Sequence, residues 1–263
     1  MHTKRLLVLV AALPIGSACV IHDKAMTPTR NDTALAEAPA APPGPIREVI
    51  GTSVEGRPIE AVTFGSGGDA VLILGGTHGD EPKSVYVARQ LIDLLSSHPD
   101  LVGGHRVTIV PVLNPDGYEV RRRRNANRVD LNRNFPTANW AKSKPRSRFH
   151  GGPTPASEPE TRALIDLVER TQPRRIASIH SIGNQQYCNN YDGPASELAR
   201  AMSAANGYRV VPSMGYSTPG SFGTWAGVER NIPTITLELP SRHSRQRCWN
   251  DNREALLGFV GAP

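Results

Sequence analysis

The chain has 263 residues, of which 38% are hydrophobic, and it carries a formal net charge of +6. This length is enough for one large α/β domain. A basic chain can bind nucleic acid, but no aromatic platform or nucleic-acid-binding motif accompanies the charge, so an anionic small substrate or polymer is the better prediction.

The N-terminus has the three parts of a secretory signal peptide. A basic start with Lys4 and Arg5 precedes an apolar run from Leu6 to Gly16, and small residues follow. The apolar run is too short to cross a membrane as a helix. We therefore predict that residues 1–18 are a signal peptide and that the protein is secreted across the inner membrane into the periplasm.

Cys19 follows Gly16-Ser17-Ala18, which resembles the lipobox of bacterial lipoproteins except that Gly16 stands where that motif usually has Leu. Lipidation of Cys19 would anchor the protein to the membrane, and ordinary cleavage just before it is the alternative. Residues 19–45 are rich in Pro and Ala and predict a flexible or polyproline-II-like tether. The remaining cysteines, Cys188 and Cys248, either form a disulfide or stay as two buried thiols.

From about residue 46, strand patterns alternate with helix patterns. We predict strands at 47–50, 58–64, 70–74, 106–113, 175–179 and 232–239, and helices at 83–95, 157–168, 195–205 and 252–260. Ser157 and Glu160 predict a capping box, with Pro159 in the first turn. The alternation predicts an α/β domain over residues 46–263, with a mostly parallel mixed central sheet and helices on both faces.

Polar side chains lie at or near the carboxyl ends of these predicted strands. His78, Asn114, His180 and Glu238 each occupy such a position. Because ligands bind outside the carboxyl ends of the strands in open α/β sheets, we expect these residues to gather at one site.

A metal site is predicted from His78, Glu81 and His180. His78 and Glu81 lie three residues apart on the loop that follows the buried strand 70–74, and His180 ends the apolar strand 175–179. A single His-x-x-Glu pattern is common by chance, and a capping or core histidine at each place is the alternative. Two His and one Glu are a ligand set of catalytic zinc, which leaves the fourth position for water, so we predict one Zn²⁺ ion.

Glu238 is predicted to be a general base. It stands near the end of a strand whose residues are apolar or β-branched on both faces, Thr234-Ile235-Thr236-Leu237-Glu238-Leu239. Alternation alone would make it a solvent-facing residue, but a carboxylate in such a strand needs a partner. Zinc lowers the pKa of its bound water to roughly 7, so that a neighbouring carboxylate can take the proton.

The stretch from Asn125 to Pro136 is polar and basic, with weak helix and strand signals. One interpretation is a surface loop. The other is a clamp for a substrate carboxylate, because Arg offers a planar fork that binds a carboxylate through two hydrogen bonds and Asn adds donors.

Several motifs in this order resemble the zinc carboxypeptidase family. Tyr216, 22 residues before Glu238, lies in a segment similar to the family's mobile Tyr loop. The resemblance covers roughly residues 46 to 260. The other motifs that carry it are His78-x-x-Glu81, Asp130-Leu131-Asn132-Arg133-Asn134-Phe135, Ser157-Glu158-Pro159-Glu160, His180-Ser181 and Glu238.

The resemblance implies a role for each matching residue. His78, Glu81 and His180 would bind zinc. Glu238 would be general base and then proton donor to the leaving amine, and Arg123 would stabilise the oxyanion. Asn132 and Arg133 would hold the substrate carboxylate, and Tyr216 would close over the substrate. Arg122 and Arg124 remain alternatives to Arg123. Arg128 departs from the family, which usually has Gly before the Val-Asp pair.

Within this family, residues 75–81, 132–140 and 215–223 are most similar to a bacterial branch that cleaves the γ-D-Glu–diaminopimelate amide bond of murein peptides. The resemblance therefore implies a secreted zinc-dependent hydrolase of that bond, in which Glu238 assists the attack of zinc-bound water. Its partner would be a murein peptide or another peptide with a free carboxylate, and we expect a monomer or a small homo-oligomer.

Three alternatives stay open at this point. The first is a metallocarboxypeptidase that acts on ordinary peptides, although Gly223, on the Tyr216 loop, brings no acidic side chain that would select a basic residue. The second is a small-molecule N-acyl amino acid deacylase of the aspartoacylase type. The third, from a different class, is a murein-binding lipoprotein without catalysis.

Overall fold

The computed structural model describes residues 44–183, 186–212 and 216–262. The predicted signal peptide, Cys19 and nearly all of the predicted tether lie outside the described residues. Among the helices of the described residues, none is long and apolar enough to cross a membrane.

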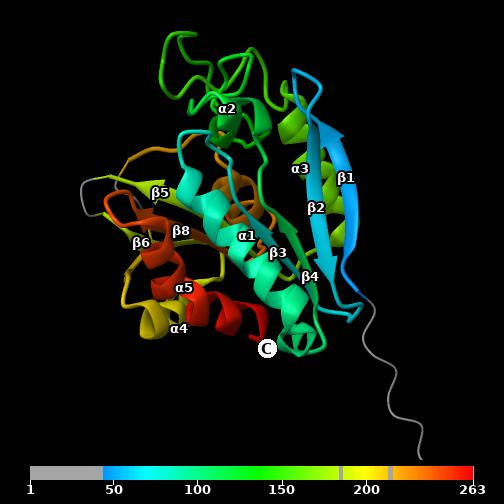
Figure 1. The fold of residues 1–263 in the computed structure, drawn as a ribbon. Coiled ribbons are helices and arrows are strands. Elements are labelled where there is room, and N and C mark those ends of the chain that lie inside the picture. The colour runs from blue at the N-terminus through cyan, green and yellow to red at the C-terminus, as the bar shows by residue number, and fades with distance from the viewer. Residues whose placement is uncertain (1–43, 184–185, 213–215, 263) are drawn as a thin grey trace, which may run out of the picture. The chain divides into compact units, whose positions relative to one another are not determined.

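In the described part of the chain, eight strands form one mixed sheet with the order β1-β2-β4-β3-β5-β8-β6-β7 (Figure 1). The four central strands β4, β3, β5 and β8 run parallel, whereas β2 and β6 join them antiparallel. The predicted α/β fold with a mostly parallel mixed sheet is therefore confirmed. The strands are β1 (Ile46–Thr52), β2 (Pro58–Phe64), β3 (Ala70–Leu74), β4 (Arg106–Val110), β5 (Arg175–Ile182), β6 (Cys188–Asp192), β7 (Arg209–Val211) and β8 (Thr234–Pro240).

Helices cover both faces of this sheet (Figure 1). One face carries α1 (Pro82–Ser97), α4 (Ser196–Asn206) and α5 (Arg245–Val260), and the other carries α3 (Pro159–Thr171) and the π-helical turn η3 (Gly223–Val228). Short helical segments complete the chain: η1 (Pro99–Val102), α2 (Pro115–Glu119) and η2 (Leu131–Arg133).

The sheet separates two hydrophobic cores, and β3 contributes to both. Val71 and Ile73 pack with Leu91 of α1, while Leu72 and Leu74 face the side of α3. All five residues of β3 are buried, as expected for a central strand with helices on both faces. The continuous apolar pattern that predicted this strand is therefore a consequence of its central place.

The predicted capping box at the start of α3 is wrong. The N-cap is Glu158, without a side-chain cap bond, rather than Ser157. The Ser157 hydroxyl donates to the Glu158 carboxylate at 2.7 Å, and the Glu160 carboxylate accepts from the Asn125 amide at 3.0 Å and from the Val54 backbone N–H at 3.2 Å. Neighbouring loops have thus recruited the carboxylates that a capping box would use.

Two short strands, β6 and β7, have no counterpart in the predicted elements. The β6 sequence, Cys188-Asn189-Asn190-Tyr191-Asp192, lacks the alternation of a half-buried strand. Its two asparagines are buried with hydrogen-bond partners: the Asn190 amide, for example, donates to the Val211 carbonyl of β7 at 2.8 Å. Strand β6 matters for function because it ends beside the site described below.

The structure decides between the two alternatives for the cysteine pair. Cys188 on β6 and Cys248 on α5 are both buried, and no disulfide joins them. Burial raises the pKa of both thiols to about 11, so they are protonated at neutral pH. They act as small core residues, and the predicted catalytic chemistry does not need them.

Candidate metal centre and active site

His78 is held by a loop that packs directly on backbone. After β3, the chain passes through Gly79 on its way to α1, and a Cβ added there would lie 2.0 Å from the carbonyl carbon of Gly117 in α2. Only glycine allows so close an approach. The Gly79 N–H also donates to the Arg123 carbonyl at 3.3 Å, so this loop and the segment after α2 are fixed against each other.

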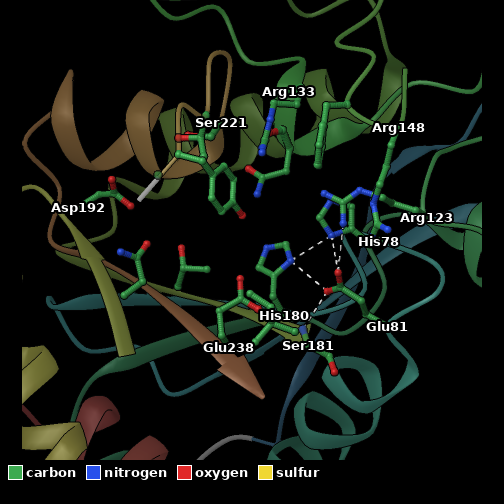
Figure 2. Close-up of a pocket in the computed structure, with 18 of the residues that line it drawn as sticks. His78, Glu81, Arg123, Arg133, Arg148, His180, Ser181, Asp192, Ser221 and Glu238 are labelled. Atoms are coloured by element: carbon green, nitrogen blue, oxygen red, sulfur yellow. Dashed lines mark hydrogen bonds and ion pairs between the residues drawn. The ribbon is translucent and has the colours of Figure 1, made fainter. Parts of the chain in front are cut away.

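The three predicted metal ligands come together at the carboxyl edge of the sheet (Figure 2). His78 Nδ1 lies 2.8 Å from Glu81 Oε1, His180 Nδ1 lies 3.1 Å from Glu81 Oε2, and the two Nδ1 atoms lie 3.1 Å apart. One donor atom of each residue falls within 4.8 Å of the others, and all three side chains are buried. His78 and Glu81 lie just before α1, with Glu81 as its N-cap, whereas His180 lies on β5.

The other ring nitrogen of each histidine is held by a fixed partner. His78 Nε2 bonds Asp130 at 2.9 Å, and His180 Nε2 bonds the Ser178 hydroxyl at 3.2 Å. The Ser181 N–H donates to Glu81 Oε2 at 3.0 Å. Partners of this kind orient metal-binding histidines, so the set of two imidazole nitrogens and a carboxylate fits a zinc ion.

Electrostatics keep the carboxylates of the site in the ionised form that suits a cation. Burial raises a carboxyl pKa, but His78 and His180 hold the pKa of Glu81 well below its ordinary value. Burial would lower the pKa of His78, yet Glu81 and Asp130 raise it to about 9, while burial lowers the pKa of His180. Two carboxylates that stay ionised beside the histidines would favour a divalent cation, which would displace the proton from His78.

Asp130 is a site residue to which the sequence analysis assigned no role. Besides His78, its carboxylate accepts from Arg123 Nε at 3.1 Å and from Arg123 Nη2 at 2.9 Å. Its pKa is lowered despite burial, because His78 and Arg123 stabilise the charge. The sequence signal was the position of Asp130 as the lone acidic residue in a long basic segment.

Of the three candidate arginines, Arg123 lies in the metal pocket. Its Nη1 is 3.5 Å from Glu81 Oε1, and the Asn114 side chain fixes its backbone by donating to its carbonyl at 3.2 Å. Arg124 points elsewhere and donates to the Pro145 carbonyl at 3.1 Å, and Arg122 lines a second cavity. Asn114, which was predicted to lie at the site without a defined role, therefore positions Arg123.

Glu238 enters the pocket from β8, next to His180 on β5. The two residues are paired in the parallel register, and Figure 2 shows the Glu238 carboxylate beside His180. Burial, and then the charge of Glu81, raise the pKa of Glu238 to about 8. It is therefore a carboxyl group that can hold a proton near neutral pH, unlike Glu81.

Asn132 and Arg133 both line the pocket, and Figure 2 shows Arg133 at its upper side. Asn132 Oδ1 accepts from the Phe222 N–H at 2.8 Å, which leaves the amide nitrogen as the donor that is free for a ligand. Arg133 is only 6% exposed. Burial lowers the pKa of Arg133, and the charge of Asp130 opposes that shift. Tyr216 lines the same cavity with 51% of its surface exposed.

A third carboxylate, Asp192 at the end of β6, lines the pocket together with Glu81 and Glu238. Figure 2 shows it on the side away from His78, Glu81 and Arg123. Within the described residues, its side chain makes no hydrogen bond or ion pair, and burial raises its pKa to about 6. It was missed because β6 itself was not predicted.

Asp192 corrects the sequence-based view of Gly223. Gly223 does lack an acidic side chain, but a Cβ added to it would lie 2.2 Å from Asp192 Oδ2. The missing side chain thus makes room for a carboxylate from another strand. The pocket therefore does contain an acidic group, Asp192, that can bind a basic group of a substrate.

The pocket has a volume of about 310 Å³, and its lining includes Phe149 beside Arg123 and Arg133. Phe149 is 45% exposed, and its ring centroid lies 5.5 Å from the Arg123 guanidinium carbon and 5.2 Å from that of Arg133. Arg148, beside it in sequence, lines the same cavity. This part of the lining is therefore cationic, with one aromatic side chain.

The comparisons with known proteins agree with this geometry. A family model described as zinc carboxypeptidase matches residues 43–254. Murein peptide amidase A of Escherichia coli K12 is 39% identical over 219 residues, which cover 78% of this chain and 85% of that protein. The murein peptide amidase A of Vibrio campbellii is 39% identical over 181 residues, which cover 64% of this chain and 68% of that protein.

The crystal structure of the murein-tripeptide amidase MpaA from Escherichia coli O157 superposes with a TM-score of 0.68 and 33% sequence identity, and the match covers 86% of this chain and 94% of that one. The chain therefore belongs to the zinc carboxypeptidase family. It is a zinc metallopeptidase or amidase, which confirms the predicted enzyme class.

Proposed function

We propose that this enzyme hydrolyses the amide bond between γ-D-Glu and diaminopimelate in murein peptides. The observation that carries the proposal is the pocket's pair of opposite charges: Arg133 lies on one side and the unpaired carboxylate of Asp192 on another. Diaminopimelate released from such a bond has a carboxylate beside the scissile nitrogen and an amino acid group at its far end. The identity to murein peptide amidase A supports the same substrate.

The carboxylate beside the scissile bond is assigned to Asn132 and Arg133. A buried guanidinium with a planar fork binds a carboxylate through two hydrogen bonds, and the Asn132 amide adds a third donor. Tyr216 lines the same cavity and has half of its surface exposed, so its side chain can close over a bound substrate.

The far end of the substrate is assigned to Asp192. A carboxylate without a partner in a pocket is unfavourable until a cation pairs with it. The distal ammonium group of diaminopimelate supplies that cation. The distal carboxylate, which is attached to the same carbon as that ammonium group, would face solvent; a lysine side chain has no such charge.

The reaction assigns a separate task to each remaining residue. Zinc held by His78, Glu81 and His180 would polarise the scissile carbonyl and lower the pKa of water. Glu238 takes the proton of the attacking water and passes it to the leaving amine, as its raised pKa allows. Arg123 donates to the oxygen on which negative charge develops, while Asp130 keeps its guanidinium in place.

The test is to incubate the purified full chain and zinc with L-Ala-γ-D-Glu-meso-diaminopimelate and to identify the products by mass. We expect release of free diaminopimelate by the wild type and almost none by Glu238→Gln. An enzyme that binds zinc but leaves this tripeptide intact would contradict the proposal.

A second candidate function is a carboxypeptidase that removes C-terminal Lys or Arg from ordinary peptides. Asp192 favours it, because the same carboxylate could read either basic side chain. A panel of peptides that end in Lys, Arg, Leu or diaminopimelate separates the two functions. Faster trimming of Lys or Arg than of diaminopimelate would move the enzyme to this second class.

We further propose that the enzyme acts outside the cytoplasm, in the periplasm. The support is the sequence of residues 1–18 and the lipobox-like context of Cys19. The mature N-terminus, read by mass spectrometry from a cell envelope preparation, tests this. A diacylglyceryl group on Cys19 that Cys19→Ser abolishes would establish the anchor, and an intact Met1 would contradict secretion.

A further inference from the structure

The positive charge of this protein is concentrated in one segment. Of the 30 Lys and Arg residues in the chain, ten lie between positions 121 and 148, where Asp130 is the only acidic residue. Arg123 and Arg133 have proposed roles in the pocket already described, and Arg148 lines that pocket as well. The other eight, called the cationic surface from here on, are Arg121, Arg122, Arg124, Arg128, Lys142, Lys144, Arg146 and Arg148.

The cationic surface has no counter-charge of its own. Among the ion pairs between described residues, none includes any of its eight members. All of them except Arg124 are exposed. Asp130 cannot neutralise them, because it is fully buried against His78 and Arg123. Charges of one sign therefore gather without mutual compensation, a pattern typical of a surface that binds an anion.

The loops that carry these charges are fixed to each other and to α3. The Arg124 guanidinium donates to the carbonyls of Pro145 and Ser147, each at 3.1 Å, and so joins the two halves of the segment. The Asn125 amide donates to the Glu158 carboxylate at 2.7 Å at the start of α3. The cationic side chains thus extend from ordered backbone, so ligand binding does not carry the entropic cost of ordering these loops.

Two of the arginines occupy backbone positions that favour glycine. Arg121 has φ 54° and Arg128 has φ 61°. A left-handed conformation costs a residue with a Cβ roughly 1–2 kcal/mol. A glycine would remove that strain at either place but would also remove the charge. Strain retained at such positions is characteristic of functional sites.

The cationic surface adjoins the metal pocket at Arg123 and at Arg148, both of which line that pocket. Arg121, Arg122, Arg124 and Arg128 line a second cavity of about 570 Å³, and Arg123 lines both cavities. Glu55 and Asp116 also line the second cavity, but Arg57 pairs with both of them. Asp80 remains as its one acidic group without an ion pair in the described structure. A chain that leaves the metal pocket past Arg123 therefore enters a region of positive charge.

We propose that the cationic surface binds the carboxylates of an extended, polyanionic peptide whose scissile bond lies at the metal centre. This inference rests on the proposed function and deepens it: the preferred substrate is a murein peptide with further acidic groups beyond the scissile bond, rather than an isolated tripeptide. Arginine, which makes up six of the eight cations, suits carboxylates because its fork binds them through two hydrogen bonds. A membrane is a less suitable partner than a peptide, because contact with a membrane through this surface would also cover the adjoining metal pocket.

The kinetic test uses two tripeptides with the same scissile bond, one extended at its amino end by two D-Glu residues and the other by two D-Gln residues. The ratio of their kcat/KM values reports the surface alone. We expect the wild type to favour the acidic peptide about three- to tenfold at low salt, as two exposed ion pairs would give. Arg122→Gln with Arg128→Gln should bring the ratio close to one, and so should 0.5 M NaCl.

Arg47→Gln with Arg245→Gln is the matched control, because these two exposed arginines lie on β1 and α5 and have no ion pair within the described structure. This variant loses the same net charge and should keep the wild-type ratio. An unchanged ratio in the Arg122/Arg128 variant, or an equal loss in the control, would overturn the proposal.

A binding measurement keeps this outcome separate from a failure of the proposed function. Fluorescence anisotropy of a labelled hexamer of D-Glu, with wild type and both double variants, needs no turnover. Weaker binding confined to the Arg122/Arg128 variant supports the surface even if no tripeptide is cleaved. Tighter binding of duplex DNA, or of vesicles with an anionic phospholipid, than of the D-Glu hexamer would overturn the assignment of the partner.

Discussion

At the scale of single residues, two glutamates face one site with pKa values moved in opposite directions. Glu81 is held ionised by His78 and His180, whereas burial and the charge of Glu81 raise the pKa of Glu238 to about 8. Such a separation assigns one carboxylate to charge stabilisation and the other to proton transfer. This separation supports the proposed roles, in which Glu81 would be a metal ligand and Glu238 would be the acid–base residue.

We predict that Glu238→Gln lowers kcat by about 10²–10⁴-fold, the usual contribution of a general base, and leaves the zinc content unchanged. Glutamine keeps the size of the side chain but cannot take a proton. Zinc per chain, measured by atomic emission, and tripeptide turnover are the two readouts. Glu60→Gln, at an exposed glutamate of β2, is the control and should keep full activity. Loss of zinc together with activity would instead make Glu238 a ligand.

A pH dependence follows from Asp192, whose pKa burial raises to about 6. Above that pH the carboxylate is charged and can pair with a substrate ammonium, and below it the group is neutral. We predict that KM for the diaminopimelate tripeptide rises about tenfold per pH unit below 6, and that Asp192→Asn removes this rise at a uniformly high KM. A substrate with a C-terminal Leu serves as the control, because its KM should not depend on Asp192.

The same pKa shift predicts a cost in stability. A carboxyl group with a raised pKa binds its proton more tightly in the folded state, so stability is lost as the pH rises from about 4 to about 6. Asp192→Asn removes that loss. Because Asp192 lines a pocket that solvent can enter, we expect Asp192→Asn to raise the free energy of unfolding by only about 1 kcal/mol at pH 7, or Tm by about 2–4 °C. A lower Tm in this variant would mean that the carboxylate has a structural partner.

At the scale of elements, the part of the pocket lined by Asn132 and Arg133 depends on the contact between two loops. The segment before η3 lies on the segment around η2: the Phe135 N–H donates to the Gly220 carbonyl at 3.0 Å, and the Phe222 N–H donates to Asn132 Oδ1 at 2.8 Å. Gly220 is essential to this contact, since a Cβ there would lie 2.3 Å from the Arg133 carbonyl oxygen.

We predict that Gly220→Ala raises KM at least tenfold and lowers stability by about 2–4 kcal/mol, because it combines an unfavourable φ of 69° with a clash against backbone. Gly207→Ala is the matched control. Gly207 has nearly the same φ, 70°, and open space around its Cβ position. It should lose only about 1–2 kcal/mol and keep the wild-type KM. Equal effects on KM would show that the loop contact does not position Asn132 and Arg133.

The elements also show what could be predicted from sequence. His78 and Glu81 follow the apolar strand β3, and His180 lies in the apolar strand β5. Because parallel strands bring their carboxyl ends to one edge, the meeting of these residues could be inferred. Asp130 could not be placed, because it lies in a segment without periodicity and its bond to His78 joins residues 52 positions apart. Asp192 was missed for another reason: β6 is polar and enters the sheet antiparallel, against the pattern of its neighbours.

At the scale of the whole molecule, the parallel order of β4, β3, β5 and β8 explains why the chemistry lies on one edge of the sheet (Figure 1). That edge collects two kinds of buried charge: the Glu81 and Asp130 carboxylates, and the Arg123 guanidinium. The cost of burying these charges is met by mutual pairing within the apoprotein. A divalent cation would add a further favourable interaction with the same carboxylates.

Metal binding should therefore be visible in global stability. A ligand that binds only the folded state at 100 times its Kd adds about 2.7 kcal/mol, which for a domain of this size is about 5–10 °C in Tm. We predict such a rise when zinc is added to chelator-treated protein, measured by calorimetry. His180→Ala should abolish it, because one of three ligands is lost, whereas His98→Ala, at the end of α1 away from the metal ligands, should retain it. An undiminished rise in His180→Ala would place the ion outside the cluster of His78, Glu81 and His180, and the roles proposed for Glu238 and Arg123 would lose their basis.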